Sequence, residues 1–200
     1  MASQISIRLA GPAHIPAMLE IYRPFIESTP VSFEDAVPSM EDFAMRIERF
    51  QRRHPCLVCL DDDTVAGYAY ASPHRARAAY QWAAEVSVYV AETHRKHGVA
   101  SALYTTLLAL LEAQNVSQAL AGMTLPNPAS EAFHASFGFE RFAVYARIGY
   151  KFGQWHDVAW MQKYLRDDPD ANPLSLRMPG ELTAEEWESA LSAGLARIKA

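Results

Sequence analysis

A short basic turn, Arg95 to Ser101, has the composition of an anion-binding site. A strand-like segment ends just before it, and a helical pattern begins at Val99. The first N–H groups of a helix lack intrahelical acceptors and carry partial positive charge, so they attract anions. Gly98 permits close backbone approach, and Arg95 and Lys96 add positive charge. The turn predicts a phosphate site in which a pyrophosphate fits; an ordinary strand–helix turn with solvated charges is the alternative.

A carboxylate lies on the strand that leads into this turn. Residues 84–90 alternate in the manner of a strand, and Glu85 stands between Ala84 and Val86. Alternate side chains of a strand face opposite sides, so the Glu85 carboxylate points either into a site beside the turn or into solvent. In a site it can act as a general base.

The loop before this strand combines two arginines with aromatic residues. Arg75 and Arg77 are guanidinium groups that can form bidentate pairs with a carboxylate or phosphinate. Tyr80 and Trp82 can add aromatic walls. A pocket for an anionic small molecule is one interpretation, and two solvated surface arginines are the other.

Other reactive side chains favour structural roles. Cys56 and Cys59 have the spacing of a redox pair or half a zinc site, but no second cysteine pair exists and their neighbours are apolar, so we expect two buried thiols. The histidines show no metal-ligand spacing, and we expect no metal. His156 and Asp157 are adjacent on a strand pattern and point apart, which favours structure, at a dimer interface, over a proton relay.

The composition excludes several classes of function. A net charge of −5 argues against a general nucleic-acid binder or a binder of anionic membranes. The N-terminal residues do not resemble a signal peptide, and polar residues interrupt every apolar stretch before membrane-spanning length. We expect a cytoplasmic protein without nucleic-acid or membrane partners.

The periodicities predict an α/β sandwich with a mixed sheet. The expected strands are residues 5–9, 56–60, 65–71, 84–90, 119–124, 140–148 and 158–164. The expected helices are residues 12–26, 39–51, 99–112 and 128–137, and one that begins at the capping box of residues 183–186. The predicted organisation is a domain of residues 1–166, a linker of residues 167–182 and a C-terminal helix of residues 183–200. The apolar stripe of that helix must be buried against its own domain or a partner subunit.

Two motifs, which follow each other along the chain in the order expected for one family, carry a family resemblance. Arg95-x-x-Gly98-x-Ala100 resembles the [QR]-x-x-G-x-[GA] signature of the GCN5-related N-acetyltransferase (GNAT) superfamily, and Asn127-x-x-Ser130 resembles its second helix start. Further segments resemble the phosphinothricin N-acetyltransferase family over residues 5–165: Gly67-Tyr-Ala-Tyr-Ala, Arg75-Ala-Arg, Trp82-x-Ala-Glu85, Leu125-Pro-Asn127 and Trp155-His-Asp-Val158. The resemblance leaves the C-terminal helix out.

This resemblance implies a GNAT fold, with a mixed central sheet flanked by helices, and a homodimer. It implies acetyl transfer from acetyl-CoA to the amino group of a small amino-acid-like substrate of phosphinothricin or methionine sulfoximine type. It also implies a cofactor site in which the sheet splays, formed by Val88, Tyr89, Val90, Arg95, Lys96, His97, Gly98, Val99, Ala100, Ser101 and Asn127.

The resemblance also implies residue roles. Glu85 is expected to be the general base for direct attack by the amine, so neither cysteine is needed as a nucleophile. His134 stands seven residues after Asn127, where many GNAT enzymes place a proton-donating tyrosine, and it is the second catalytic candidate. The expected substrate contacts are Phe33, Arg75, Arg77 and Tyr80. An acetyltransferase for another small amine and a non-catalytic acetyl-CoA-binding sensor remain as alternatives.

Overall fold

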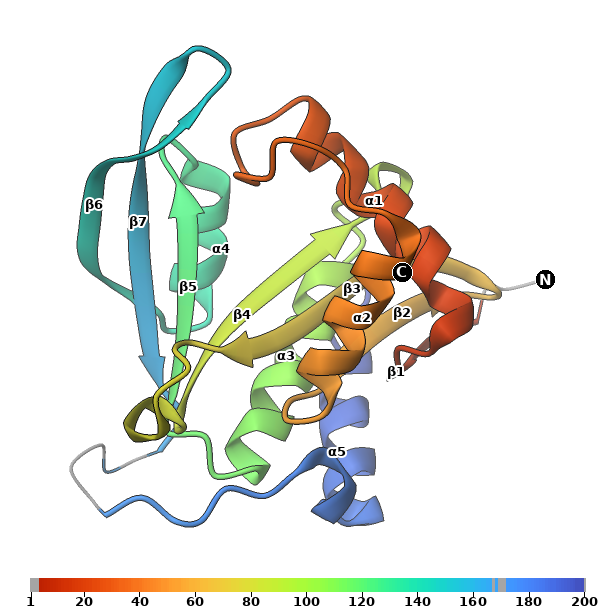
Figure 1. Cartoon of the computed structure of the whole chain (residues 1–200). Helices are drawn as coiled ribbons and strands as arrows, with labels where there is room; N and C mark the ends of the chain where they lie inside the picture. Colours follow the sequence, from red (N-terminus) through yellow and green to blue (C-terminus); the bar gives the residue numbers. More distant parts are fainter. Residues whose placement is uncertain (1–3, 167, 169–171, 200) are drawn as a thin grey trace.

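A computed structural model describes residues 4–166, 168 and 172–199, and its centre is a seven-stranded sheet (Figure 1). Residues 167 and 169–171 of the predicted linker lie outside the described residues. In sheet order the strands are β1 (Ile5–Leu9), β2 (Cys56–Asp61), β3 (Thr64–Pro73), β4 (Ala83–Val90), β5 (Gln118–Thr124), β7 (Gln154–Tyr164) and β6 (Glu140–Lys151). The helices are α1 (Ile15–Glu27), α2 (Met40–Gln51), α3 (Val99–Ala113), α4 (Pro128–Ser136) and α5 (Ala184–Leu195). The predicted fold class is confirmed.

The two predicted strands of the β6–β7 hairpin were too short at its tip. Strand β7 begins at Gln154 rather than at residue 158, and β6 continues to Lys151 rather than ending at residue 148. The added residues pair with each other as the tip of a hairpin, for example Tyr150 with Trp155. Cross-strand pairing stabilises them, although their sequence lacks a clear alternation.

The sheet divides between β4 and β5, the one parallel pair among the described strands. Strands β1 to β4 are antiparallel neighbours, but β4 and β5 run parallel and pair only over Ala83–Glu85 with Gln118–Leu120. Beyond Glu85 the two strands diverge, and Figure 1 shows the resulting V-shaped opening. The residues of β4 beyond Glu85 therefore have no strand partner on their β5 side.

Each face of the sheet has its own core. Helices α1 and α2 cover one face, where Met18, Ile26 and Ile47 are buried against Val58 and Tyr68. Helix α3 covers the other face with a fully buried leucine row at positions 103, 107, 110 and 111. This burial removes apolar surface from water on both faces, at about 25 cal/mol per Å².

The two cysteines belong to different faces. Cys56 packs in the α1–α2 core and Cys59 in the α3 core, because an odd spacing on a strand places side chains on opposite sides. Both thiols are free and buried, and burial raises the pKa of Cys56 to about 12 and that of Cys59 to about 11. Neither thiol is a nucleophile at neutral pH.

Helix α5 lies against α3. It begins with the predicted capping box, in which the Thr183 hydroxyl accepts from the Glu186 amide and the Glu186 carboxylate accepts from the Thr183 amide. Gly194 allows the two helices to touch, because a Cβ there would collide with the Thr106 hydroxyl and the Ala102 carbonyl. The apolar stripe of α5 packs against the α3 core, so it is buried against its own domain.

Candidate active site

The opening between β4 and β5 exposes backbone groups of β4. Ala91 N donates to Ala66 O on β3 at 2.9 Å. Alternate residues of an antiparallel strand direct both backbone groups to the same neighbour, so the amides of Val88 and Val90 point away from β3 into the opening. The Tyr89 amide faces β3 by the same alternation. An extended, amide-containing ligand can therefore pair with Val88 and Val90 as an added strand would.

The turn before α3 leaves a set of backbone N–H groups free. Ala102 N makes the first bond of the helix, to Gly98 O at 2.8 Å, so the N–H groups of Val99, Ala100 and Ser101 have no intrahelical acceptor. Lys96 and Gly98 adopt left-handed conformations, with φ of 70° and 86°, which turn the chain into a concave loop. Such a loop at a helix N-terminus favours a phosphate or diphosphate.

The predicted residues of this turn contribute in different ways. Arg95, Lys96 and His97 have exposed side chains, and the Arg95 guanidinium lies 5.9 Å from the centre of the Phe25 ring. The Val99 side chain is buried in the α3 core, so only its backbone can serve a ligand.

A cavity of about 230 Å³ lies between the divergent strands and α4. Its lining includes Val88 and Tyr89 of β4, Ala100 of α3, Asn127 just before α4, and Ser130 and His134 of α4. Asn127 caps α4, because its Oδ1 accepts from Ser130 N at 3.1 Å. The structure thus brings the predicted turn, the strand and both α4 residues to one cavity.

One ring nitrogen of His134 makes a hydrogen bond that fixes the imidazole. Its Nδ1 lies 2.7 Å from the Ser130 carbonyl oxygen, which can only accept, so Nδ1 carries a proton. Burial among the rings of Tyr104, Phe133 and Phe139 lowers its pKa, and the bond to Ser130 opposes this shift. The imidazole is therefore neutral at neutral pH with an unprotonated Nε2, which makes it an acceptor rather than a donor. A proton-donating role, as a tyrosine would have, does not suit this state.

A second cavity, of about 220 Å³, contains Glu85. It shares Val86, Ser87 and Gly122 with the first cavity, and so the two cavities lie side by side. The Glu85 side chain is 33% exposed and therefore reaches the cavity without lying in bulk water. The predicted position of the carboxylate beside the opening agrees with this geometry.

The sequence reasoning missed a partner of Glu85. His74 Nδ1 lies 2.8 Å from Glu85 Oε1, and the His74 side chain is only 16% exposed. Edge-to-face contacts with Tyr80 and Trp160 fix the imidazole ring. The only sequence signal was a histidine next to two arginines, and local spacing does not indicate that it turns toward β4.

The loop of residues 28–39 closes the site from the α1 side. Val31 lines both cavities and Phe33 lines the one that contains Glu85. Lys151, a buried side chain on β6, ties the loop to α1: its Nζ donates to Ile26 O in α1 at 2.6 Å and to Ser32 O in the loop at 2.7 Å. The Phe33 ring also packs on Gly149, where any Cβ would collide with it. Lys151 and Gly149 were not predicted, because they lie more than a hundred residues from the loop.

The other predicted substrate contacts lie at the rim. Arg75 and Arg77 are exposed in the loop between β3 and β4 and are not among the residues that line the Glu85 cavity. Tyr80 is 44% exposed and reaches the site only through His74. Tyr89 packs on Tyr22, Phe25 and Tyr68, and burial raises its pKa well above the usual value, so its phenol stays protonated.

His156 and Asp157 do not form a pair. His156 is buried with Nε2 3.0 Å from Lys151 O, whereas Asp157 Oδ1 accepts from Arg147 N at 2.7 Å. Both therefore stabilise the β6–β7 hairpin. Among the described residues, no three His, Cys, Asp or Glu side chains gather as a metal site. None of the described helices is long and apolar enough to cross a membrane.

The sheet splits between β4 and β5, the turn before α3 suits a phosphate, and the cavity beside the split contains Glu85. Together these features define an acyltransferase site of the GNAT type, and the comparison with known families agrees. The acetyltransferase (GNAT) domain model matches residues 7–160, and the chain belongs to this acetyltransferase family.

Relatives within the family are more specific. The chain is 38% identical to a phosphinothricin N-acetyltransferase of Streptomyces viridochromogenes, over 80% of this chain and 87% of the relative. It is 30% identical to an L-methionine sulfoximine/L-methionine sulfone acetyltransferase of Salmonella typhimurium, over 84% of this chain and 99% of the relative. A crystal structure of a phosphinothricin acetyltransferase from Sinorhizobium meliloti in complex with AcCoA matches with a TM-score of 0.80 and 32% identity, over 87% of this chain and 94% of that one. The predicted family is confirmed.

Proposed function

We propose that this protein transfers an acetyl group from acetyl-CoA to the amino group of a small amino-acid-like substrate, with Glu85 as the general base. The observation that carries this proposal is that the Glu85 cavity adjoins the cavity in the opening between β4 and β5 and shares lining residues with it. The named activities of the phosphinothricin and methionine sulfoximine relatives support the substrate class.

The described residues fit coenzyme A in three places. The free N–H groups at the start of α3 suit its diphosphate, and Arg95 and Lys96 add charge beside them. The amides of Val88 and Val90 suit its amide-containing arm, whose thioester end then lies near His134. Asn127 caps α4 through its Oδ1, and so it places that helix against the opening while it lines the cavity itself.

The acetyl thioester supplies the carbonyl carbon that the amine attacks. Glu85 removes one proton from the substrate ammonium, which frees the nitrogen lone pair. A bond then forms between the amine nitrogen and the carbonyl carbon, and the carbon–sulfur bond breaks. Of the two protons that the ammonium loses in total, one leaves through Glu85 and the other goes to the sulfur.

His134 acts on this site as an acceptor. Its neutral state, set by burial and by the Ser130 carbonyl, leaves Nε2 free to accept from a group at the thioester end of the cavity. His134 therefore orients a group at the thioester end and can accept a proton from it, but it does not protonate the leaving sulfur.

A neutral small amine is the second candidate substrate. Arg75 and Arg77, the cations expected to bind an anionic substrate, are exposed and lie outside the lining of the Glu85 cavity. The comparison of phosphinothricin with uncharged amines of similar size distinguishes the two. For an anionic substrate, Arg77→Ala raises KM for phosphinothricin more than for the uncharged amine.

The direct test is the variant Glu85→Gln, which keeps the shape of the side chain but cannot accept a proton. We expect kcat to fall by about 10²-fold or more, within the range for loss of a general base. Binding of acetyl-CoA, measured by calorimetry, stays unchanged because Glu85 does not line the first cavity. Thiol release from acetyl-CoA with a panel of amines is the readout. Unchanged kcat would remove Glu85 as the base, and coenzyme binding without turnover of any amine by the native protein would favour a sensor.

We also propose a homodimer formed through the edge strand β6. Large apolar side chains there and at the hairpin tip are roughly half exposed: Phe142, Val144, Ile148, Tyr150, Phe152 and Trp155. Such a patch on an unpaired edge favours association with another surface. Light scattering should give twice the mass of one chain, and the double variant Tyr150→Glu/Trp155→Glu should give the monomer. Leu174→Glu, an equally exposed site elsewhere, is the control.

A further inference from the structure

Residues 196–199, which follow α5, lie directly against the diphosphate turn. Lys199 N donates to His97 O at 3.0 Å. The Arg197 carbonyl occupies the space that a Cβ at position 98 would need, so Gly98 is required both for its left-handed φ and for this contact. These residues lie outside the region 7–160 that the family model matches. A segment outside the region that the family model matches thus supports the turn that is proposed to bind coenzyme A.

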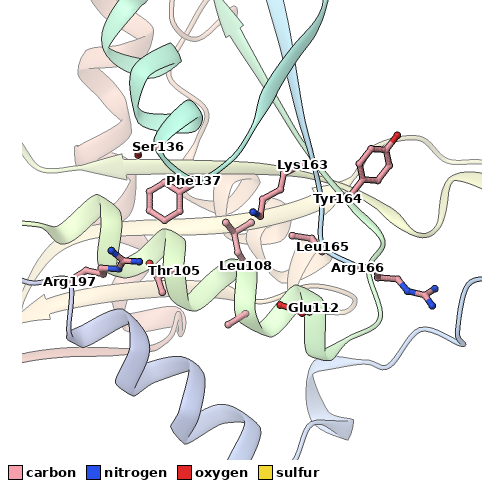
Figure 2. Close-up of a pocket in the computed structure, with 11 residues that line it drawn as sticks. Thr105, Leu108, Glu112, Ser136, Phe137, Lys163, Tyr164, Leu165, Arg166 and Arg197 are labelled. Atoms are coloured by element: carbon pink, nitrogen blue, oxygen red, sulfur yellow. The ribbon is translucent and has the colours of Figure 1, made fainter. Parts of the chain in front are cut away.

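The same segment places a charged side chain in a groove on the outer side of α3. The groove has a volume of about 480 Å³, and its lining includes Thr105, Leu108, Ser136, Phe137, Lys163 and Arg197. Figure 2 shows the Arg197 guanidinium beside Thr105 and the Lys163 amine directed toward the middle of the groove. Within the described part of the chain, neither cation makes a side-chain hydrogen bond or ion pair. These two cations without partners line the groove together with the apolar side chains of Leu108 and Phe137. The lining also contains Arg166 and one carboxylate, Glu112.

The groove begins where the diphosphate site ends. Thr105 is four residues after Ser101, and so it lies about 6 Å further along the same side of α3. In coenzyme A the group that follows the diphosphate is an adenosine that carries a 3′-phosphate. The apolar side chains of the groove suit the base, and the two unpaired cations suit the phosphate.

We propose that this groove binds the 3′-phosphoadenosine end of coenzyme A, and that Arg197 pairs with the 3′-phosphate with help from Lys163. The inference rests on the proposed use of acetyl-CoA. If the proposal is correct, residues 196–199 belong to the coenzyme site. Their backbone supports the diphosphate turn, and the Arg197 side chain binds the 3′-phosphate. Arginine suits this role because its planar guanidinium can form two parallel bonds to a phosphate.

The test uses two coenzymes that differ only in the group at issue, acetyl-CoA and acetyl-dephospho-CoA, which lacks the 3′-phosphate. For the native protein we expect KM for acetyl-dephospho-CoA to be about tenfold higher than KM for acetyl-CoA. The variant Arg197→Gln should raise KM for acetyl-CoA about tenfold, change KM for acetyl-dephospho-CoA less than twofold and leave kcat unaltered. Lys163→Gln should show the same selectivity with a smaller effect. Arg52→Gln, at an exposed arginine that directly follows α2 and pairs with Glu48, is the matched control and should change neither value.

Three results would overturn the proposal. Equal rises in KM for both coenzymes would limit residues 196–199 to a structural role, and an unchanged KM would exclude Arg197 from the site. Thermal unfolding without ligand checks that the variant is folded. Calorimetry with CoA and dephospho-CoA tests the groove independently of the reaction. If the native protein releases no thiol but binds CoA more tightly than dephospho-CoA, the groove is still the 3′-phosphate site and only the proposed function is wrong. Equal affinity for CoA and dephospho-CoA would remove the groove as the phosphate site.

Discussion

The proposed base depends on a neighbour that fixes it. Glu85 emerges from β4 at the last residue that pairs with β5, so its backbone is held on both sides. Its carboxylate, however, needs a partner to stay in one rotamer, and His74 provides the bond at 2.8 Å. His74 is itself held by ring contacts with Tyr80 and Trp160. The base is thus oriented by a histidine that has no contact with the opening for the coenzyme, which makes His74 a positioning residue.

This arrangement predicts a graded series at position 74. His74→Phe keeps an aromatic ring but removes the bond to Glu85, and we expect kcat to fall about tenfold, as for loss of a hydrogen bond to a charged group. His74→Asn places a donor close to the position of Nδ1 and should restore part of the loss. KM for acetyl-CoA, measured in the same assays, should change little. Equal activity of the Phe variant and the native protein would show that Glu85 does not need His74.

At the scale of elements, the site is assembled from parts that touch only in the folded chain. The loop of residues 28–39 covers the Glu85 cavity with Val31 and Phe33, but it has no strand or helix of its own to hold it. Lys151 on β6 replaces such a structure because it donates both to the loop carbonyl of Ser32 and to the carbonyl of Ile26 in the last turn of α1. Burial lowers the pKa of Lys151, and the two carbonyls compensate for the lost hydration of its ammonium. Strand β6 therefore shapes the substrate cavity without lining it.

The variant Lys151→Met tests this connection. It keeps the aliphatic bulk and leaves the carbonyls of Ile26 and Ser32 without their donor, which costs about 1–3 kcal/mol of stability. We expect KM for the amine to rise about tenfold because the loop no longer holds Phe33 over the cavity. KM for acetyl-CoA serves as the internal control and should stay within twofold. A similar rise for both substrates would indicate a general loss of structure instead.

The sequence predicts the secondary-structure elements better than the contacts between them. The helices and most strands follow from local periodicity, and the turn of residues 95–101 from its charge and glycine. The pairing of Glu85 with His74, the hold of Lys151 on Ser32 and the contact of Arg197 with Gly98 were not predicted. Each depends on how elements distant in sequence pack together, and no local pattern specifies that. The exposure of Arg75 and Arg77 has the same origin, since composition indicated their chemistry but not their direction.

At the scale of the whole molecule, stability should depend on pH through a buried histidine remote from the site. His54 follows α2, is 1% exposed, and has its pKa lowered from 6.5 to about 4 by burial and by the charge of Arg53. Between these two values the unfolded chain binds a proton at His54 and the folded chain does not. The free energy of unfolding therefore falls as pH decreases from 6.5 toward 4, and above 6.5 His54 has no effect.

The expected size of this effect is about 2 kcal/mol between pH 7 and pH 5, at about 1.4 kcal/mol per unit of pKa difference. Urea unfolding at the two pH values measures it. His54→Gln, whose amide does not titrate, should reduce the change in unfolding free energy between pH 7 and pH 5 by this amount, even if the variant is less stable at both. His134 has a pKa lowered by burial in the same direction, so the His54→Gln protein should keep a smaller dependence of the same sign. An identical pH dependence in the native protein and the His54→Gln variant would mean that His54 is protonated or hydrated in the folded chain. In that case the core beneath α2 would be open to water at this point.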